Sequence, residues 1–156
     1  SYLYAIVKGE NIGKTPARNL RVAIGIFAHN ATGLILRANQ SKICDGNPSN
    51  FRTATPFVFP GGVFADGAIR HFADEADSYP PTHMIREQNT SFWLLGCVFY
   101  SGVDASKSFT TGFAFQIGKI LSREVGDYQS NWSFKERIKR DEFVFIRDSI
   151  GDARTN

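Results

Sequence analysis

The stretch FWLLGCVFYSGVDASKSFTTGFAFQI, residues 92–117, decides the fold class. Its first part, residues 92–100, is apolar on both faces, as expected of a central strand. After the polar segment 101–107, large apolar residues alternate with small or polar ones from Phe109 to Ile117, which is the period of a half-buried strand. Two such runs joined by a short loop predict a β-hairpin.

Other segments of the chain show strand patterns too. The predicted strands are Tyr2–Lys8, Leu20–Phe27, Gly33–Ala38, Thr53–Phe59 and Glu142–Arg147. Residues 63–72 fit a strand, but Ile69, Phe72, Ala73 and Ala76 also fit helical spacing. Thr82 is placed to cap a helical turn that runs through Gln88, and Ser133 and Glu136 have capping-box spacing before a basic turn.

These patterns predict a mainly β fold, an immunoglobulin-like antiparallel β-sandwich of about seven or eight strands with one to three short helical turns. The chain of 156 residues has the length of one ordinary domain. We expect a single domain over residues 1–150 and a polar tail at 151–156. The composition, with 42% hydrophobic and 21% charged residues, is that of a globular protein.

The segment NIGKTPA, residues 11–17, lies between the first two predicted strands. Together with Gly9 it is similar to a phosphate-binding loop, in which four residues separate two glycines before Lys and Ser or Thr. Here only three residues separate Gly9 from Gly13, and a strand pattern follows where that motif needs a helix. We therefore predict no nucleotide site, and we expect Lys14 to be exposed to water.

A structural role accounts better for the residues of this segment. Asn11 can bond its own backbone and start a turn, and Gly13 can adopt a positive φ. Pro16 fixes its own φ and keeps Thr15 extended. Ala17 is small enough to lie beneath the turn. The segment therefore predicts a compact crossing between two strands, which passes from one sheet to the other.

The charge and the apolar runs exclude several classes of protein. The net charge of +3 is small and spread along the chain, so it is a weak argument for nucleic-acid or membrane binding. The longest apolar run, residues 92–100, is well short of the roughly 20 residues of a spanning helix. The chain starts at Ser1 without an initiator Met or a signal peptide, so we expect it to be excised from a longer protein.

The chain contains two cysteines. Cys97 lies inside the apolar run, and Cys44 lies in a polar, loop-like stretch. They could form one disulfide in an oxidising compartment. The favoured interpretation is two unpaired thiols, because two cysteines define no disulfide framework and a buried thiol behaves as a small apolar group.

Two blocks of the chain resemble a pattern known elsewhere. The first is the segment 11–17 between two strands. The second is LLGCVFY at 94–100, a loop with Asp104, and TGF at 111–113. Both resemble parts of uncharacterised bacterial proteins that carry one or two membrane-spanning helices before an extramembrane β-sandwich. The loop itself departs from that pattern, because residues 101–104 replace a more polar Tyr-x-Asp run. The resemblance implies a β-sandwich and a membrane-anchored bacterial parent protein, and it implies no activity.

The densest group of possible metal ligands begins at His71. On a helix, His71 and Glu75 would share a face, and His83 could join them only if the chain folds back. One His and one carboxylate are half of a metal site, so the favoured interpretation is a solvated acidic face. We predict no cofactor and no catalytic residue, since the chain also lacks the Gly-x-Ser-x-Gly pattern of a nucleophilic serine. An enzyme or small-ligand domain using residues 71–77 is the first alternative.

A basic segment at residues 135–140 lies close to aromatic residues. Basic groups beside aromatic rings can follow a nucleic-acid backbone and stack on its bases. Acidic residues interleave with this segment, however, and alternating signs are typical of a solvated helix face. Nucleic-acid binding through residues 135–140 is therefore the second alternative and is not predicted.

The predicted function is that of a non-catalytic binding or interaction module. Sandwich domains recognise partners through end loops or exposed sheet edges. The candidate loops are residues 42–50 and the hairpin loop with Ser101, Val103, Asp104 and Lys107. The expected partner is a protein, and contact with a membrane is expected only through an anchor outside this chain.

Overall fold

The computed structural model describes residues 2–28, 33–45, 47, 51–71, 90–104, 106–132 and 139–147. The elements are, in chain order, β1 (Tyr2–Glu10), β2 (Ala17–Ala28), α1 (Gly33–Ile43), β3 (Phe51–Val58), β4 (Val63–His71), β5 (Thr90–Ser101), β6 (Ser108–Ser122), β7 (Asp127–Gln129), β8 (Asn131–Trp132), the 3-10 helix η2 (Arg140–Glu142) and β9 (Phe143–Arg147). The mainly β, antiparallel class is therefore confirmed, whereas the immunoglobulin-like topology is not confirmed.

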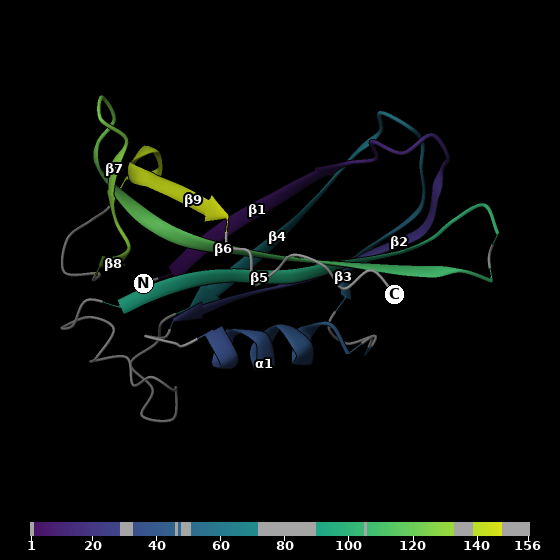
Figure 1. The fold of residues 1–156 in the computed structure, drawn as a ribbon, viewed down its shortest axis with the longest axis horizontal. Coiled ribbons are helices and arrows are strands. Elements are labelled where there is room, and N and C mark those ends of the chain that lie inside the picture. Colours follow the sequence, from purple (N-terminus) through teal and green to yellow (C-terminus); the bar gives the residue numbers. More distant parts are fainter. Residues whose placement is uncertain are drawn as a thin grey trace.

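The strands form a seven-stranded main sheet and a separate two-stranded ribbon (Figure 1). The main sheet has the order β3-β2-β5-β6-β7, with β8 paired to β5 and β9 paired to β6. The ribbon pairs β1 with β4 in antiparallel register, from Tyr2 opposite His71 to Glu10 opposite Val63. The predicted strand is therefore confirmed for residues 63–71, and the helical alternative at residues 69–76 is wrong for residues 69–71, the part of it that the structure describes.

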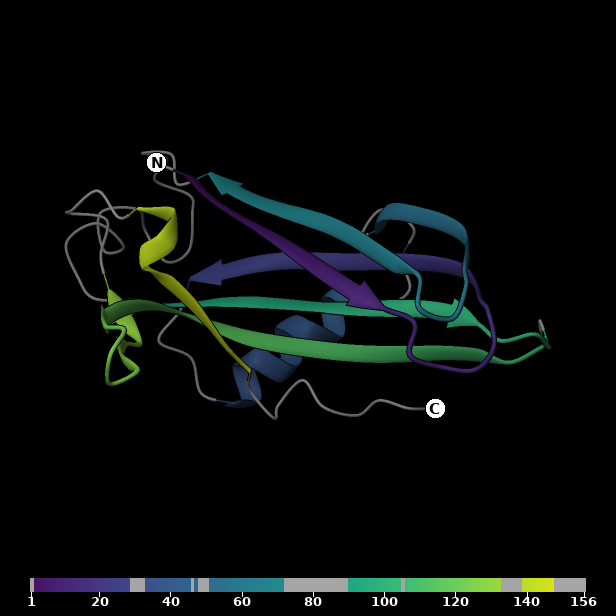
Figure 2. The same cartoon turned by 90° about the horizontal axis from the view of Figure 1, so that it is seen from above.

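The ribbon covers one face of the main sheet, and α1 covers the other face (Figures 1 and 2). The core on the ribbon side contains Leu3, Ala5, Ile24, Ile26, Ala28, Ala68, Phe92, Leu94 and Ile117. The core on the α1 side contains Leu36, Trp93, Leu95 and Ala114. Strand β5 contributes to both because successive side chains of a strand point to opposite faces. Each large apolar side chain that it buries stabilises the fold by about 1.5–3 kcal/mol.

Gly96 lies in the middle of β5, where neighbours approach closely. It is opposite Phe113 in the register with β6 and opposite Ile24 in the register with β2. A Cβ atom at Gly96 would collide with the Phe113 ring and with the carbonyl oxygen of Ala23. The close packing of the central strands therefore requires a glycine here.

The predicted strand at Gly33–Ala38 is wrong, because these residues form the first half of α1. Three side chains at helical spacing connect this helix to the main sheet. Leu36 is buried, Ile43 packs against the α1-side core, and Gln40 Nε2 donates a hydrogen bond to the carbonyl oxygen of Phe113 at 3.1 Å. The short apolar run in the sequence predicted a strand. In the folded chain a helix forms instead, because it places Leu36, Gln40 and Ile43 against the sheet. None of the helices in the described ranges is long and apolar enough to cross a membrane.

Several boundaries differ from the prediction. Strand β2 begins at Ala17, before the predicted Leu20, because it continues through a bulge at which Asn19 has a φ of 50°. Strands β7 and β8 were not predicted, since they are too short to show a periodic pattern. The predicted helical turns at 82–88 and 133–136 and the tail at 151–156 lie outside the described residues.

Cys44 and Cys97 form a disulfide, so the prediction of two unpaired thiols is wrong. Their Cα atoms are 5.7 Å apart, which is a usual separation for a bridged pair. Cys44 follows α1 directly, and Cys97 lies on β5 two positions after Leu95, on the face toward α1. The bridge therefore fixes the end of the helix to the central strand.

Replacing both cysteines with alanine (Cys44→Ala, Cys97→Ala) should lower the free energy of unfolding by about 4 kcal/mol, the loop-closure entropy for a loop of this length. Urea denaturation monitored by circular dichroism measures the change. Dithiothreitol reduces the disulfide, so it should lower the free energy of unfolding of the native protein by a similar amount. It should leave that of the double variant unchanged. A native denaturation midpoint that does not respond to reductant would contradict this prediction.

Candidate functional site at one end of the main sheet

Three loops lie at one end of the main sheet, at the right of Figure 1. Arg18 of β2 lies opposite Phe57 of β3 and opposite Ser101 of β5, so these strands end side by side. The loops next to these positions are residues 11–16, 59–62 and 102–107. We call these three loops together the loop end.

Asn11 joins two of the loops through five hydrogen bonds. Its Nδ2 donates to the carbonyl oxygens of Thr15 at 2.9 Å and Val58 at 2.8 Å. Its Oδ1 accepts a bond from the Gly13 N–H at 3.0 Å. Its backbone N–H donates to Gly62 O at 3.0 Å, and its carbonyl accepts from Gly61 N at 2.8 Å. One residue therefore fixes the β1–β2 crossing against the β3–β4 turn.

The other residues of the segment have different surroundings. The segment passes from the ribbon to the main sheet, and Ala17 is buried there with Leu20, Val22 and Val58. Lys14 and Thr15 are exposed, and the carbonyl oxygen of Thr15 accepts the hydrogen bond from Asn11 Nδ2. Gly13 does not have a positive φ, so that expectation is wrong. The φ of 75° belongs to Gly61 in the facing turn. Pro16 lies directly before β2.

Replacing Asn11 with alanine should destabilise the domain by about 1–3 kcal/mol, because the part-buried carbonyl of Val58 loses its hydrogen-bond donor. Asn11→Asp keeps the shape but turns a carboxylate toward two carbonyl oxygens, so it should cost at least as much. Urea denaturation measures both. The control Lys14→Ala changes an exposed side chain of the same loop and should stay within about 0.5 kcal/mol of the native value.

Large apolar side chains are exposed at the loop end. The exposed fractions are 91% for Ile12, 64% for Phe59 and 54% for Val103, and Val63, the first residue of β4 beside this end, is 66% exposed. A single exposed apolar residue is ordinary, but a group at one end of a domain is typical of an interaction site. The strand pattern at residues 53–59 did not reveal Phe59 as exposed, since its position at the turn shows only in the folded chain.

The hairpin loop after Ser101 is held by its own hydrogen bonds. Asp104 Oδ1 accepts a bond from the Ser106 N–H at 3.0 Å, and the Asp104 carbonyl accepts one from Lys107 N at 3.1 Å. The side chain and the backbone N–H of Ser106 lower the pKa of the Asp104 carboxyl. Val103, Asp104 and Lys107 are exposed and Ser101 is half-buried, so the loop presents an apolar residue between charges of both signs.

The Asp104 carboxylate should order this loop in a pH-dependent way. Its pKa is lowered in the folded protein, so the stabilisation is complete above the unfolded pKa near 3.8. It is lost as the pH falls through the lower, folded pKa. The Ser106 amide resonance, followed by NMR, should shift upfield over that acid range. In the control variant Asp104→Asn the shift should be absent, and a shift that persists there would contradict the assignment.

The predicted metal ligands are not brought together within the described residues. His71 is the last residue of β4 and lies opposite Tyr2. Glu75 and His83 fall in the range 72–89, which the structure does not describe. The described part of the chain contains no group of three or more side chains that could hold a metal ion.

The remaining predicted segments are only partly described. Lys42, in the predicted loop 42–50, lies in α1, and residues 48–50 are outside the described ranges. In the basic segment 135–140, only Lys139 and Arg140 are described, at the start of η2.

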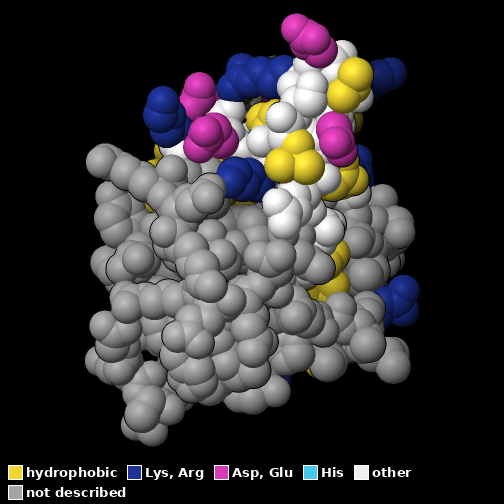
Figure 3. Space-filling view, turned by 90° about the vertical axis from the view of Figure 1, so that its left-hand side faces the viewer, with side chains coloured by type: hydrophobic (Ala, Val, Ile, Leu, Met, Phe, Trp, Pro, Cys, Tyr) yellow, Lys and Arg dark blue, Asp and Glu magenta, His cyan; other side chains and the backbone are white. Residues whose placement is uncertain are grey.

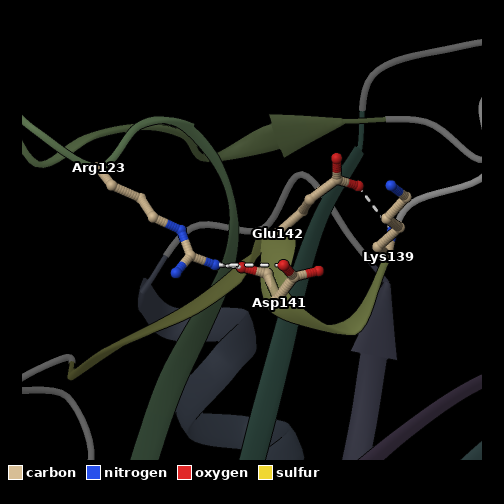
Figure 4. Close-up of polar contacts among 4 residues, drawn as sticks. All are labelled: Arg123, Lys139, Asp141 and Glu142. Atoms are coloured by element: carbon tan, nitrogen blue, oxygen red, sulfur yellow. Dashed lines mark hydrogen bonds and ion pairs between the residues drawn. The ribbon is translucent and has the colours of Figure 1, made fainter.

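A groove of about 410 Å³ lies at the opposite end of the main sheet, between the β6–β7 hairpin and η2–β9. Arg123 Nη2 donates to the Asp141 carbonyl oxygen and lies 3.6 Å from Asp141 Oδ2 (Figure 4). The Lys139 N–H donates to Glu142 Oε2 at 2.6 Å. Figure 3 shows charges of both signs around exposed hydrophobic side chains at this end. Because Arg123 and Asp141 join the hairpin to η2, we assign them a structural role.

Comparison with known proteins adds no relative. No protein-family model, curated protein or solved structure matches the chain.

Proposed function

We propose that this domain is a non-catalytic binding module and that its loop end contacts a protein partner. The observation that carries the proposal is the group of exposed apolar side chains Ile12, Phe59 and Val103 on the three loops, together with Val63 at the start of β4. Exposed charged residues, among them Lys14, Asp104 and Lys107, belong to the same loops. An apolar centre with a polar rim is the usual anatomy of a protein interface.

The hydrogen bonds of the loop end support the same proposal. Asn11 holds two of its loops together, and Asp104 holds the third in shape. Association costs less free energy when the binding loops are already ordered, because less conformational entropy is lost. Loops of this kind can present exposed apolar side chains in one arrangement to a partner.

The disulfide is relevant to the cellular compartment of the domain. Structural disulfides persist in oxidising compartments and are rare in the cytosol. The bridge between Cys44 and Cys97 therefore supports a domain that is displayed on the oxidising side of a membrane. With the resemblance of residues 11–17 and 94–113 to anchored bacterial proteins, we propose a membrane-anchored bacterial parent.

Co-purification from an extract of the source cells tests the loop end. The loop-end variant Ile12→Ser/Val103→Ser should retain at least tenfold less of the protein partner than the native domain, a loss of about 1.4 kcal/mol or more. Both side chains are mainly exposed, so the fold should be unaffected.

The matched control is Leu121→Ser/Val125→Ser, which replaces two exposed aliphatic residues at the opposite end of the sheet. This variant should retain the partner as the native domain does. Equal retention by the two variants, or loss with the Leu121/Val125 variant alone, would contradict the proposal. Circular dichroism melting curves establish that all three proteins are folded.

A further inference from the structure

Strand β6 has a free edge at the border of the main sheet. On one side it pairs with β5, from Ser108 opposite Ser101 to Ile117 opposite Phe92. On its other side, β9 pairs with residues 115–119 and β7 pairs with residues 119–122. Within the described part of the chain, residues 108–114 therefore have a strand on one side only (Figure 2). We call residues 108–114, with the sequence SFTTGFA, the open edge.

The backbone of the open edge can form further hydrogen bonds. Alternate residues of an edge strand turn their N–H and C=O groups away from the sheet. Among the described residues, the bond from Gln40 Nε2 to the carbonyl oxygen of Phe113, at 3.1 Å, is the only one that reaches this backbone from outside the β5–β6 pair. A carbonyl oxygen has two lone pairs and can accept a second bond. The open edge can therefore pair with one more strand.

The open edge lacks the residues that prevent strand addition at other edges. Proteins usually protect a free edge with charged side chains or with proline. Strand β3, at the opposite border of the main sheet, contains the exposed Pro56, which has no N–H to donate. Strand β1 of the ribbon carries the exposed charges of Lys8 and Glu10. The open edge contains no charged residue and no proline, so it is a template for an added strand.

The sequence of the open edge is complementary to itself in antiparallel order. If two copies pair about a two-fold axis at Thr111, Phe109 of one copy lies opposite Phe113 of the other. Thr110 then lies opposite Gly112, and each Thr111 lies opposite its own copy. Aromatic pairs and threonine pairs stabilise antiparallel strands, and in this register no like charges oppose each other. The register also uses the whole of the open edge, which favours a second copy of the chain as the added strand.

The side chains of the open edge have surface left to bury in such a pair. Phe113 packs against the ribbon-side core, and Phe109 stacks on Tyr100 with ring centroids 5.3 Å apart. Both phenylalanines are only half-buried, so a ring from the opposite strand can cover their exposed parts. Thr111 is exposed between them, on the same face of the strand because side chains alternate. Pairing would therefore bury apolar surface as well as satisfy backbone groups.

We propose that the open edge joins two copies of this chain into a symmetric dimer with one continuous antiparallel sheet. The interface is isologous, because the same residues of each copy contact each other across a two-fold axis. The two loop ends point in opposite directions in this dimer, since the paired strands are antiparallel. One pair of short strands is a small interface, so the dimer should dissociate on dilution. The inference is independent of the proposed function, because residues 108–114 belong to none of the three loops of the loop end.

Sedimentation equilibrium of the whole chain over a series of concentrations tests the inference. The average mass of the native chain should rise from monomer toward dimer with concentration. Thr111→Lys and Thr111→Glu should each weaken association at least tenfold, because two like charges then meet on the axis. An equimolar mixture of these two variants should associate at least tenfold more strongly than either alone, because Lys then opposes Glu. Such rescue locates the axis, since only a residue on the axis lies opposite its own copy.

The matched control is Thr15→Lys, which makes the same change at an exposed threonine of the loop end. It should leave the association of the chain unchanged. Circular dichroism melting curves establish that every variant is folded. The inference is overturned if the native chain stays monomeric at all concentrations. It is also overturned if the mixture of Thr111→Lys and Thr111→Glu associates no better than the separate variants.

Two other occupants of the open edge give different results, and either would replace the second copy. If the native chain is monomeric but a chain truncated after Arg147 dimerises and loses association with Thr111→Lys, residues 148–156 of the same chain occupy the edge. If the native chain is monomeric and Thr111→Lys loses a protein that co-purifies with the native chain, a strand of that protein occupies the edge.

Discussion

The burial of β5 on both faces is the constraint on which the rest of the structure depends. Phe92 and Leu94 pack toward the ribbon, and Trp93 and Leu95 pack toward α1. A strand of this kind cannot lie at the surface, because each of its faces would expose large apolar side chains to water. The ribbon and α1 are therefore both needed, and the disulfide at Cys97 fixes the second of them to the strand.

The ribbon determines where the chain crosses between the two layers. Its strands β1 and β4 are neighbours, and the strands that they connect to, β2 and β3, are neighbours in the main sheet. The chain therefore crosses twice between the same two layers at the same end, and the two crossings run side by side (Figures 1 and 2). This is why a single residue, Asn11, can hydrogen-bond to both crossings.

The arginines at the two ends of the main sheet have different partners. At one end, Arg123 pairs with Asp141 across an exposed junction, an interaction worth about 0–1 kcal/mol. At the other end, Arg18 and Arg21 stack on Phe57 and Phe51 without a carboxylate among the described residues. A guanidinium whose partner is a ring still has N–H groups to offer a ligand. At this end the described contacts of the two guanidinium groups are therefore with aromatic rings.

The sequence by itself determined the elements whose signal is local. The apolar run 92–100 and the alternation after it defined the central hairpin, and Asn11 marked a strand crossing, because strand periodicity and turn chemistry depend only on near neighbours. Only the tertiary structure decided the rest. Leu36 belongs to a helix because a sheet face covers it, and Cys44 pairs because that helix brings it to β5. Arg21 acquired its aromatic partner through a bulge and a neighbouring strand, contacts that no local pattern encodes.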